Sequence, residues 1–179
     1  APSGQEEVVI EPGMAFGTGQ HETTKLCLAA LDRLSFGSGG GHVPSVLLDV
    51  GCGTGILAIG AIRLGFTSAV GIDHDADAVR IARENAEINQ VDGACIFSAT
   101  PIAQVEETFP IVVANIMAPP LIAMATPLST RVADAGCLLL SGILHHQAPD
   151  VIAAYGAEGW GCVRQDEAGD WVLLEFVRR

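Results

Sequence analysis

Residues 49–56 read Asp-Val-Gly-Cys-Gly-Thr-Gly-Ile, with an apolar run over 46–48 before them and a helix-like run over 56–64 after them. This is the order of a strand, a glycine turn and a helix. Gly51, Gly53 and Gly55 allow the backbone to turn tightly and to approach a ligand, because they carry no side chain. We also expect free backbone N–H groups at the start of the helix, facing that ligand.

An acidic residue follows the next apolar run of the chain. Asp73 comes directly after residues 69–72 and 22 positions after Gly51. At this distance from a glycine turn, a carboxylate can accept hydrogen bonds from both hydroxyls of a ribose. The turn and Asp73 together predict a nucleoside-binding βαβ unit.

The spacing of the glycines separates two kinds of nucleoside cofactor. The dinucleotide fingerprint G-x-G-x-x-G requires a glycine or alanine where this chain has Ile56. The observed pattern, D-x-G-x-G-x-G, is typical of proteins that bind S-adenosylmethionine. Backbone N–H groups suit the carboxylate of its methionine end, and Asp49 suits the ammonium. The alternative is a glycine turn that only packs a helix onto a sheet.

Composition limits the class of protein. A chain of 179 residues with 49% hydrophobic residues fits one domain whose sheet is buried on both faces. No apolar run reaches the length of a membrane span. The formal net charge of −12 argues against direct nucleic-acid binding and favours a basic partner.

The cysteines and histidines give no metal pattern. The five cysteines are scattered and form no C-x-x-C pair, so we expect free thiols in a reducing cytoplasm. His145 and His146 are adjacent without a cluster of further ligands, so we expect no metal site. We interpret His21 as a structural residue of its loop, and Trp160 and Trp171 as core residues.

The periodicity of the chain predicts a series of alternating elements. Asp75 is a suitable N-cap for the third helix, and Pro120 suits a helix start, with Pro127 expected to kink or end that helix. The other helices are expected over residues 23–34, with Leu26, Ala30 and Leu34 on one face, and over 56–64, 75–89 and 147–155. Strands are expected over residues 8–10, 46–50, 69–72, 94–97, 111–114, 137–140, 161–165 and 171–177.

Alternation of strands and helices followed by a hairpin predicts an α/β fold. We expect a doubly wound, mostly parallel seven-stranded sheet with a C-terminal antiparallel hairpin, turning at 167–170. This is the Rossmann-like fold of class I S-adenosylmethionine-dependent methyltransferases. In such a sheet the ligand lies beyond the carboxyl ends of the strands. Gly51, Asp73 and Asn115 all fall at such ends.

Several segments together resemble one family. They are E-P-G-M-A-F-G-T-G-Q-H-E-T-T at 11–24, D-V-G-C-G-T-G-I-L-A-I at 49–59, G-I-D-H-D at 71–75, V-A-N-I-M-A-P-P-L at 113–121 and L-L-S-G-I-L at 139–144. In these segments the chain resembles the methyltransferases that modify large-subunit ribosomal protein eleven. The resemblance covers nearly the whole chain, and the F-G-T-G-x-H-x-T-T part is its most specific element.

The resemblance implies a set of site residues. Asn115 and Thr18 would face the incoming amine as catalytic residues, and Asn115 would accept one amine proton and aim the lone pair at the methyl group. The alternative for Asn115 is a cap of the turn from strand to helix. The residues that would bind S-adenosylmethionine are Phe16, Gly17 and Thr18 as a lid, together with Thr24, Asp49, Gly51, Gly53, Gly55, Asp73 and Asn115.

The resemblance also implies the reaction, which is methylation of lysine side chains and of the N-terminal amine of the ribosomal protein. Family members usually carry an additional N-terminal domain that recognises this substrate, and this sequence begins just before the 11–24 loop. We therefore expect a linker remnant over 1–10 and a methyltransferase domain over 11–179, as a fragment or a short enzyme. We expect a cytoplasmic monomer that does not bind membranes.

Two other readings stay open. One is a methyltransferase for another protein or for a small molecule, since the docking domain is expected to be missing. The other is a non-enzymatic or nicotinamide-binding module.

Overall fold

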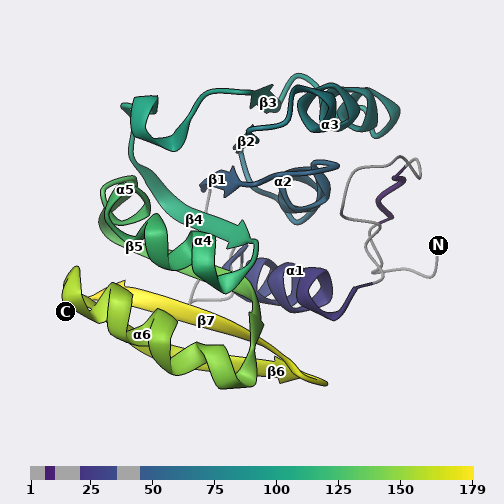
Figure 1. Ribbon diagram of the computed structural model, residues 1–179. Helices are drawn as coiled ribbons and strands as arrows, with labels where there is room; N and C mark the ends of the chain where they lie inside the picture. Colours follow the sequence, from purple (N-terminus) through teal and green to yellow (C-terminus); the bar gives the residue numbers. More distant parts are fainter. Residues whose placement is uncertain (1–6, 11–20, 36–44) are drawn as a thin grey trace.

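The computed structural model describes residues 7–10, 21–35 and 45–179. These residues form one seven-stranded sheet between two layers of helices (Figure 1). The strands are β1 (Val46–Val50), β2 (Ser68–Ile72), β3 (Cys95–Ser98), β4 (Phe109–Asn115), β5 (Val132–Leu144), β6 (Trp160–Ala168) and β7 (Trp171–Arg178). The helices are α1 (Glu22–Ser35), α2 (Ile56–Arg63), α3 (Ala76–Ile88), α4 (Ala118–Ala123), α5 (Ala125–Ser129) and α6 (Ala148–Ala157), with short 3-10 turns η1 (Ile102–Gln104) and η2 (His145–Gln147).

The strands are ordered β3-β2-β1-β4-β5-β7-β6. The first five are parallel, whereas β7 is antiparallel to β5 and to β6. This confirms the predicted fold class. The last strand of the chain lies inside the sheet and β6 lies at its edge, because β7 is mostly apolar and buried whereas β6 carries the exposed run 163–165.

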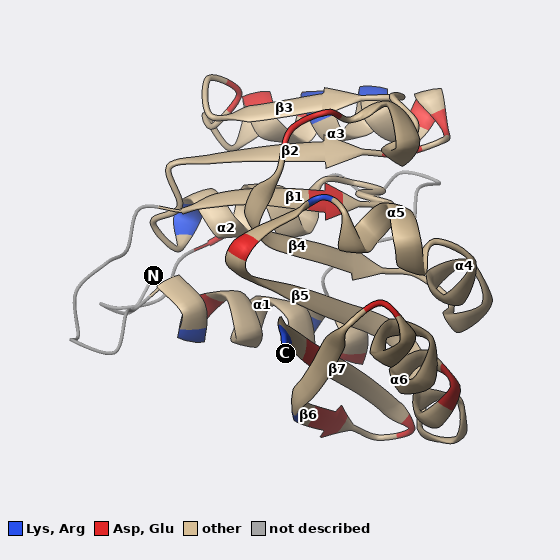
Figure 2. Ribbon diagram, turned by 90° about the vertical axis from the view of Figure 1, so that its left-hand side faces the viewer, with Lys and Arg blue, Asp and Glu red and all other residues tan. Residues whose placement is uncertain are grey.

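Two hydrophobic cores cover the two faces of the sheet. Helices α1, α2 and α3 pack on one face, and α4, α5 and α6 pack on the other (Figures 1 and 2). Neighbouring residues of β1 alternate between them: Leu47 belongs to the first core and Leu48 to the second. Because successive side chains of a strand point to opposite faces, a sheet covered on both sides needs apolar residues at nearly every position.

The predicted strand over 8–10 is wrong. These residues form no strand, and the side chain of Asn89 binds them instead. The N–H of Val9 donates to Oδ1 of Asn89 at 2.9 Å, and Nδ2 of Asn89 donates to the carbonyl of Val9 at 2.6 Å. The amide of Asn89 thus replaces a neighbouring strand as the partner of this backbone.

The buried face of α1 differs in part from the predicted face. Ala30 is buried as expected, but Cys27 and Leu31 are the other fully buried apolar residues, while Leu26 and Leu34 lie at the margin of the core. Thr24 is also buried and belongs to this inner face. The helix is therefore rotated relative to the predicted orientation, with Thr24 on its buried side.

Pro127 ends a helix, as predicted. The helix breaks after Ala123, and Pro127 lies in the separate short helix α5. A proline ring meets the carbonyl of the residue four positions before it, which here is that of Ala123.

Strand β5 is longer than the predicted strand over 137–140. It continues past Ser141 and Gly142 because a break in the register with β7, between Leu140 and Ile143, accommodates them. Such a bulge keeps a strand in the sheet while redirecting it locally.

The two tryptophans differ in burial. Trp160 is a core residue as expected, and the guanidinium of Arg178 lies over its ring. Trp171 is only half-buried. No helix in the described part of the chain has the length and hydrophobicity that crossing a bilayer requires.

Candidate active site at the carboxyl ends of the strands

The glycine turn between β1 and α2 is closed by its own backbone. Gly51, Gly53 and Gly55 have φ angles of 75°, 52° and 81°, in the left-handed region that favours glycine. The N–H groups of Gly51 and Cys52 donate to the carbonyl of Ile72 at 2.8 and 3.1 Å, and that of Gly55 donates to the carbonyl of Cys52 at 2.8 Å. The N–H of Gly53 donates to Asp73. These four N–H groups of the turn are therefore not free, because Ile72, Cys52 and Asp73 already accept them. The expected free N–H groups at the start of α2 stay a prediction.

Two of these glycines lie so close to neighbouring side chains that a Cβ would collide with them. A Cβ on Gly51 would lie 2.6 Å from Cγ2 of Ile116, directly after β4. A Cβ on Gly55 would lie 2.9 Å from Cζ of Phe97 on β3. Close packing of the turn against Ile116 and Phe97, together with the positive φ angles, therefore accounts for glycine at both positions. Their predicted contact with a cofactor stays a prediction.

Asp73 is held in place at the end of β2. Its Oδ2 accepts the N–H of Gly53 at 2.9 Å, and its Oδ1 accepts the N–H of Asp75 at 3.0 Å. The exposed ring of His74 also lies 3.3 Å from Oδ1, measured from Nδ1. Each carboxylate oxygen can accept more than one hydrogen bond, so the fixed Asp73 can still receive ribose hydroxyls.

Asp49 is a buried carboxyl group beneath the turn. It is 1% exposed and, within the described residues, neither of its oxygens has a hydrogen-bond partner of normal geometry. Burial raises its pKa to about 7, partly offset by the N–H of Ala58 and raised further by the charge of Asp73. Such a group is costly unless a ligand supplies a donor or a positive charge.

Two further polar atoms at this end of the sheet lack partners. Oγ1 of Thr24, on α1, and Oδ1 of Asn115, at the end of β4, are buried and make no hydrogen bond within the described residues. Register places the strand ends together, since Val50 pairs with Ile72 on one side and with Ala114 on the other. The fold thus brings Gly51, Asp73 and Asn115 to one edge, as the sequence predicted.

The electrostatics of this edge favour a cationic ligand. Asp49 and Asp73 lie on either side of the glycine turn. Burial, with a smaller contribution from the charge of Asp49, raises the pKa of the Cys27 and Cys52 thiols, which therefore stay protonated. Among the described residues, no group of three or more His, Cys, Asp and Glu side chains is arranged to hold a metal ion. An organic cation with hydrogen-bond donors suits this site better than a pyrophosphate, which carries negative charge.

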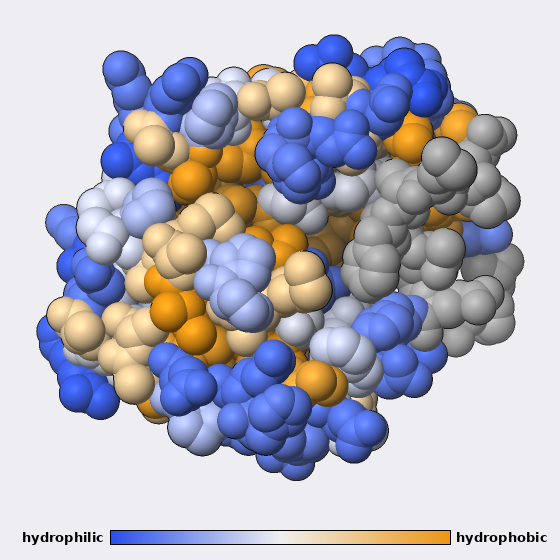
Figure 3. All heavy atoms as spheres, in the orientation of Figure 1, coloured by the Kyte–Doolittle hydropathy of each residue, from blue (hydrophilic) through white to orange (hydrophobic). Residues whose placement is uncertain are grey.

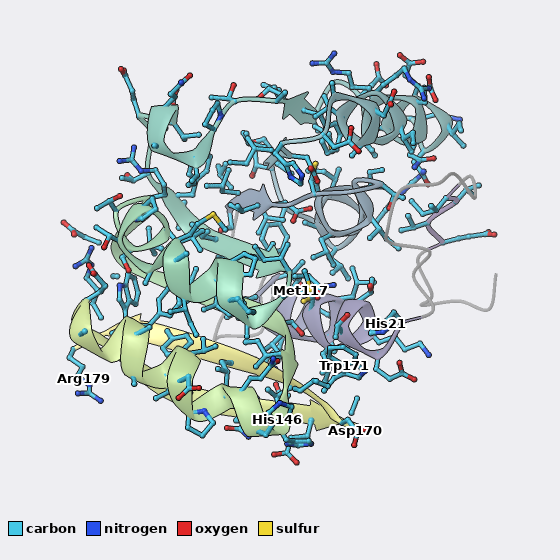
Figure 4. The ribbon with its side chains drawn as sticks, in the orientation of Figure 1. His21, Met117, His146, Asp170, Trp171 and Arg179 are labelled. Carbon is cyan, nitrogen blue, oxygen red and sulfur yellow. The ribbon has the colours of Figure 1, made fainter. Side chains whose placement is uncertain are left out.

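An aromatic contact that was not predicted from the sequence joins His21 to Trp171. The rings of His21 and Trp171 meet edge to face at 5.0 Å between centroids, and Figure 4 shows them side by side at the start of α1. His21 also approaches Oγ1 of Thr23 at 2.8 Å from its Nδ1, which supports its structural role. A histidine and a tryptophan 150 positions apart carry no local signal of this contact.

Met117, two residues after Asn115, is a large apolar residue that is 70% exposed. It lies near the middle of the face drawn in Figures 3 and 4, where apolar residues gather inside a hydrophilic rim. The predicted lid and second catalytic residue, Phe16, Gly17 and Thr18, lie outside the described residues.

Comparison with known proteins identifies the family. The model of the family "Ribosomal protein L11 methyltransferase (PrmA)" matches residues 1–179, the whole chain. The chain belongs to this family. L11 is the large-subunit ribosomal protein eleven of the resemblance described above, which is thereby confirmed.

Individual similar proteins support this family assignment. The chain is 44% identical, over 169 residues, to a ribosomal protein L11 methyltransferase of Citrifermentans bemidjiense. The crystal structure of a ribosomal protein L11 methylase from Lactobacillus delbrueckii subsp. bulgaricus superposes with a TM-score of 0.89 at 31% identity, covering 98% of this chain and 86% of that one. Magnesium protoporphyrin IX methyltransferase from Synechocystis, solved with bound S-adenosylmethionine, shares the fold alone, with a TM-score of 0.68 at 20% identity over 92% of this chain and 88% of that one.

The match to the Citrifermentans bemidjiense relative covers 94% of this chain but 55% of the relative. The chain thus spans about half the length of the curated relatives it matches.

Proposed function

We propose that this chain is the catalytic part of an S-adenosylmethionine-dependent methyltransferase that modifies lysine side-chain and N-terminal amines of ribosomal protein L11. Membership of the family supports the substrate. The observation that supports this cofactor is Asp49, whose two buried oxygens have no hydrogen-bond partner of normal geometry within the described residues. A carboxylate in that position suits the ammonium of a methionine moiety and opposes the phosphates of a dinucleotide.

The residues present fit this cofactor. Asp73 would receive the ribose hydroxyls, and Asp49 and Oγ1 of Thr24 would take the polar methionine end. Gly51, Gly53 and Gly55 shape the turn beneath it. Phe16, Gly17 and Thr18 are proposed to cover it. When bound, S-adenosylmethionine supplies a methyl group on a positively charged sulfur.

Asn115 is proposed to orient the amine. A lysine amine has a pKa of about 10.4, so presenting it in the neutral form at pH 7 costs roughly 4–5 kcal/mol. Desolvation at a site that already holds positive charge reduces this cost. The Oδ1 atom of Asn115, buried without a partner among the described residues, can accept one amine proton and thereby direct the nitrogen lone pair. Water can take the released proton.

Binding measurements test the cofactor directly. Isothermal titration of residues 1–179 with S-adenosylmethionine, S-adenosylhomocysteine and NAD should give binding for the first two alone. Tight NAD binding without S-adenosylmethionine binding would overturn the proposal. Mass spectrometry of ribosomal protein L11 after incubation then tests the substrate. Methylation of other amines but not of L11 would favour the alternative of another protein or a small molecule.

The proposed function also includes the domain bounds, the charge of the partner, the cellular compartment and the oligomeric state. Residues 11–179 would form the methyltransferase domain after a linker over 1–10. The net charge of −12 suits the basic ribosomal protein as a partner. All five cysteines are free, which agrees with a reducing cytoplasm. We expect a monomer, and light scattering during size-exclusion chromatography measures this.

A further inference from the structure

Ile116, the residue after Asn115, lies between two glycines: Gly51, directly after β1, and Gly142, within β5. A Cβ on Gly51 would lie 2.6 Å from Cγ2 of Ile116. A Cβ on Gly142 would lie 2.5 Å from the carbonyl oxygen of Ile116 and 3.1 Å from its nitrogen. The end of β4 therefore occupies space that any other residue at 51 or 142 would require.

The bulge of β5 brings Gly142 to this position. Asn115 pairs with Ser141, and the N–H of Ile116 donates to the carbonyl of Ser141 at 3.1 Å. The hydroxyl of Ser141 donates in turn to the carbonyl of Val172 on β7 at 3.1 Å. A hydrogen bond to β7 thus stabilises the bulge, and the bulge in turn binds the backbone of Ile116.

We propose that Gly142 is a positioning residue for Asn115, acting through the backbone of Ile116. The inference rests on the proposed function, in which Asn115 orients the amine. The Cβ of a residue at 142 would meet main-chain atoms of Ile116, so no side-chain rotation can relieve the contact. An alanine would displace the carbonyl of Ile116 by about 0.5 to 1 Å before an ordinary contact is reached. A shift of this size at an orienting group reduces the rate by roughly 10- to 100-fold.

The chain offers a matched control for backbone strain. Gly142 has a φ of 82° and Gly159, after α6, has a φ of 87°. A Cβ on Gly159 would meet nothing within 4 Å. Gly142→Ala and Gly159→Ala therefore impose similar strain on the backbone, but only the first displaces Ile116.

Two kinds of measurement test the proposal on the 179-residue chain. The first is kcat with ribosomal protein L11, together with the Kd of S-adenosylhomocysteine. The second is the side-chain NH₂ signal of Asn115 in a 15N–1H spectrum, assigned by its loss in Asn115→Ala. Gly142→Ala should move this signal and lower kcat by roughly 10- to 100-fold, with Kd changed by less than about 3-fold. Gly159→Ala should leave all three unchanged, and an equal loss in that variant would overturn the proposal.

A double variant separates positioning from a general structural effect. In the Asn115→Ala background, Gly142→Ala should reduce kcat by less than about 2-fold more, because its route runs through the residue already removed. A second full-sized loss would show that Gly142 acts by another route.

A second variant applies if Gly142→Ala does not fold. Ser141→Ala removes the hydroxyl that holds the bulge to the carbonyl of Val172. This variant should also move the Asn115 signal and lower kcat, because the backbone of Ile116 is supported by the same bulge. An unmoved signal with the wild-type kcat would overturn the proposal.

The activity and the spectrum together distinguish failure of the proposed function from failure of the positioning role of Gly142. A wild-type chain that transfers no methyl group would contradict the proposed function alone. An Asn115 signal unmoved by Gly142→Ala would contradict the positioning role alone.

Discussion

Gly53 donates its backbone N–H to Oδ2 of Asp73 at 2.9 Å, so a residue of the glycine turn holds the acid at the end of the neighbouring strand. The turn and the acid are therefore one unit rather than two independent ligand contacts. The N–H of Asp75 fixes the other oxygen. The carboxylate is oriented by the protein, which reduces the entropy lost when a ribose binds.

Replacement of Asp73 should weaken cofactor binding. We expect Asp73→Ala to raise the free energy of S-adenosylmethionine binding by about 1–3 kcal/mol, because it leaves the ribose hydroxyls and the N–H of Gly53 without their acceptor. Isothermal titration measures this. Asp77→Ala, on the exposed start of α3, is the control and should bind normally. An unchanged Kd in Asp73→Ala would show that Asp73 does not bind the ribose.

Replacement of Asn115 should affect the rate rather than the fold. Its Oδ1 has no partner within the described residues, so Asn115→Ala removes no hydrogen bond of that atom, and Tm should stay within a few degrees. We expect kcat to fall by roughly 10²-fold or more, with a modest change in cofactor affinity. Unfolding of the variant would indicate a structural cap, and a normal rate would make Thr18 the leading candidate.

Asp49 should make the cofactor-free protein less stable as the pH rises. Burial raises its pKa from 3.8 to about 7, so between these values the folded state holds a proton that the unfolded state has released. The free energy of unfolding therefore falls as pH increases through this window. Asp49→Asn removes the effect, and its stability relative to wild type should grow by on the order of 2–4 kcal/mol between pH 5 and pH 8.

Urea denaturation of both proteins at several pH values measures this difference. The exposed Asp92→Asn variant is the control, and its curve should run parallel to that of wild type. A parallel curve for Asp49→Asn as well would mean that Asp49 is ionised in the folded protein at low pH. The same variant should also lose cofactor affinity, because an amide cannot balance an ammonium charge.

A polypeptide of residues 1–179 should methylate ribosomal protein L11 more slowly than a full-length family member. The chain spans 55% of the Citrifermentans bemidjiense relative, and binding energy from remote contacts positions the reacting group. Rates of methyl transfer, followed by mass spectrometry under the same conditions, compare the two. Equal rates would mean that these residues recognise L11 unaided.

Local sequence determined the elements and the strand ends of this protein. The glycine turn, the acid after β2 and the N-cap at Asp75, which accepts the N–H of Asp77 at 2.9 Å, each depend on residues close together in the chain. A turn needs residues that tolerate positive φ, and a cap needs a side chain two positions from its donor. Each requirement concerns the type of a single residue, so the turn and the cap could be predicted from the sequence. The edge at which Gly51, Asp73 and Asn115 meet could be predicted as well.

The construction of that edge depends on contacts between residues that are far apart in the chain. Three contacts join residues from different strands and helices: the closure of the turn by Ile72, the support of Ile116 by Gly142 and the contact of His21 with Trp171. The burial of Asp49 without a hydrogen-bond partner among the described residues also depends on the packing of several elements. No periodicity along the chain states which strands are neighbours or where a bulge falls. These features arise when the two helical layers close on the sheet, because packing then determines which polar atoms are removed from water and which backbones come into contact.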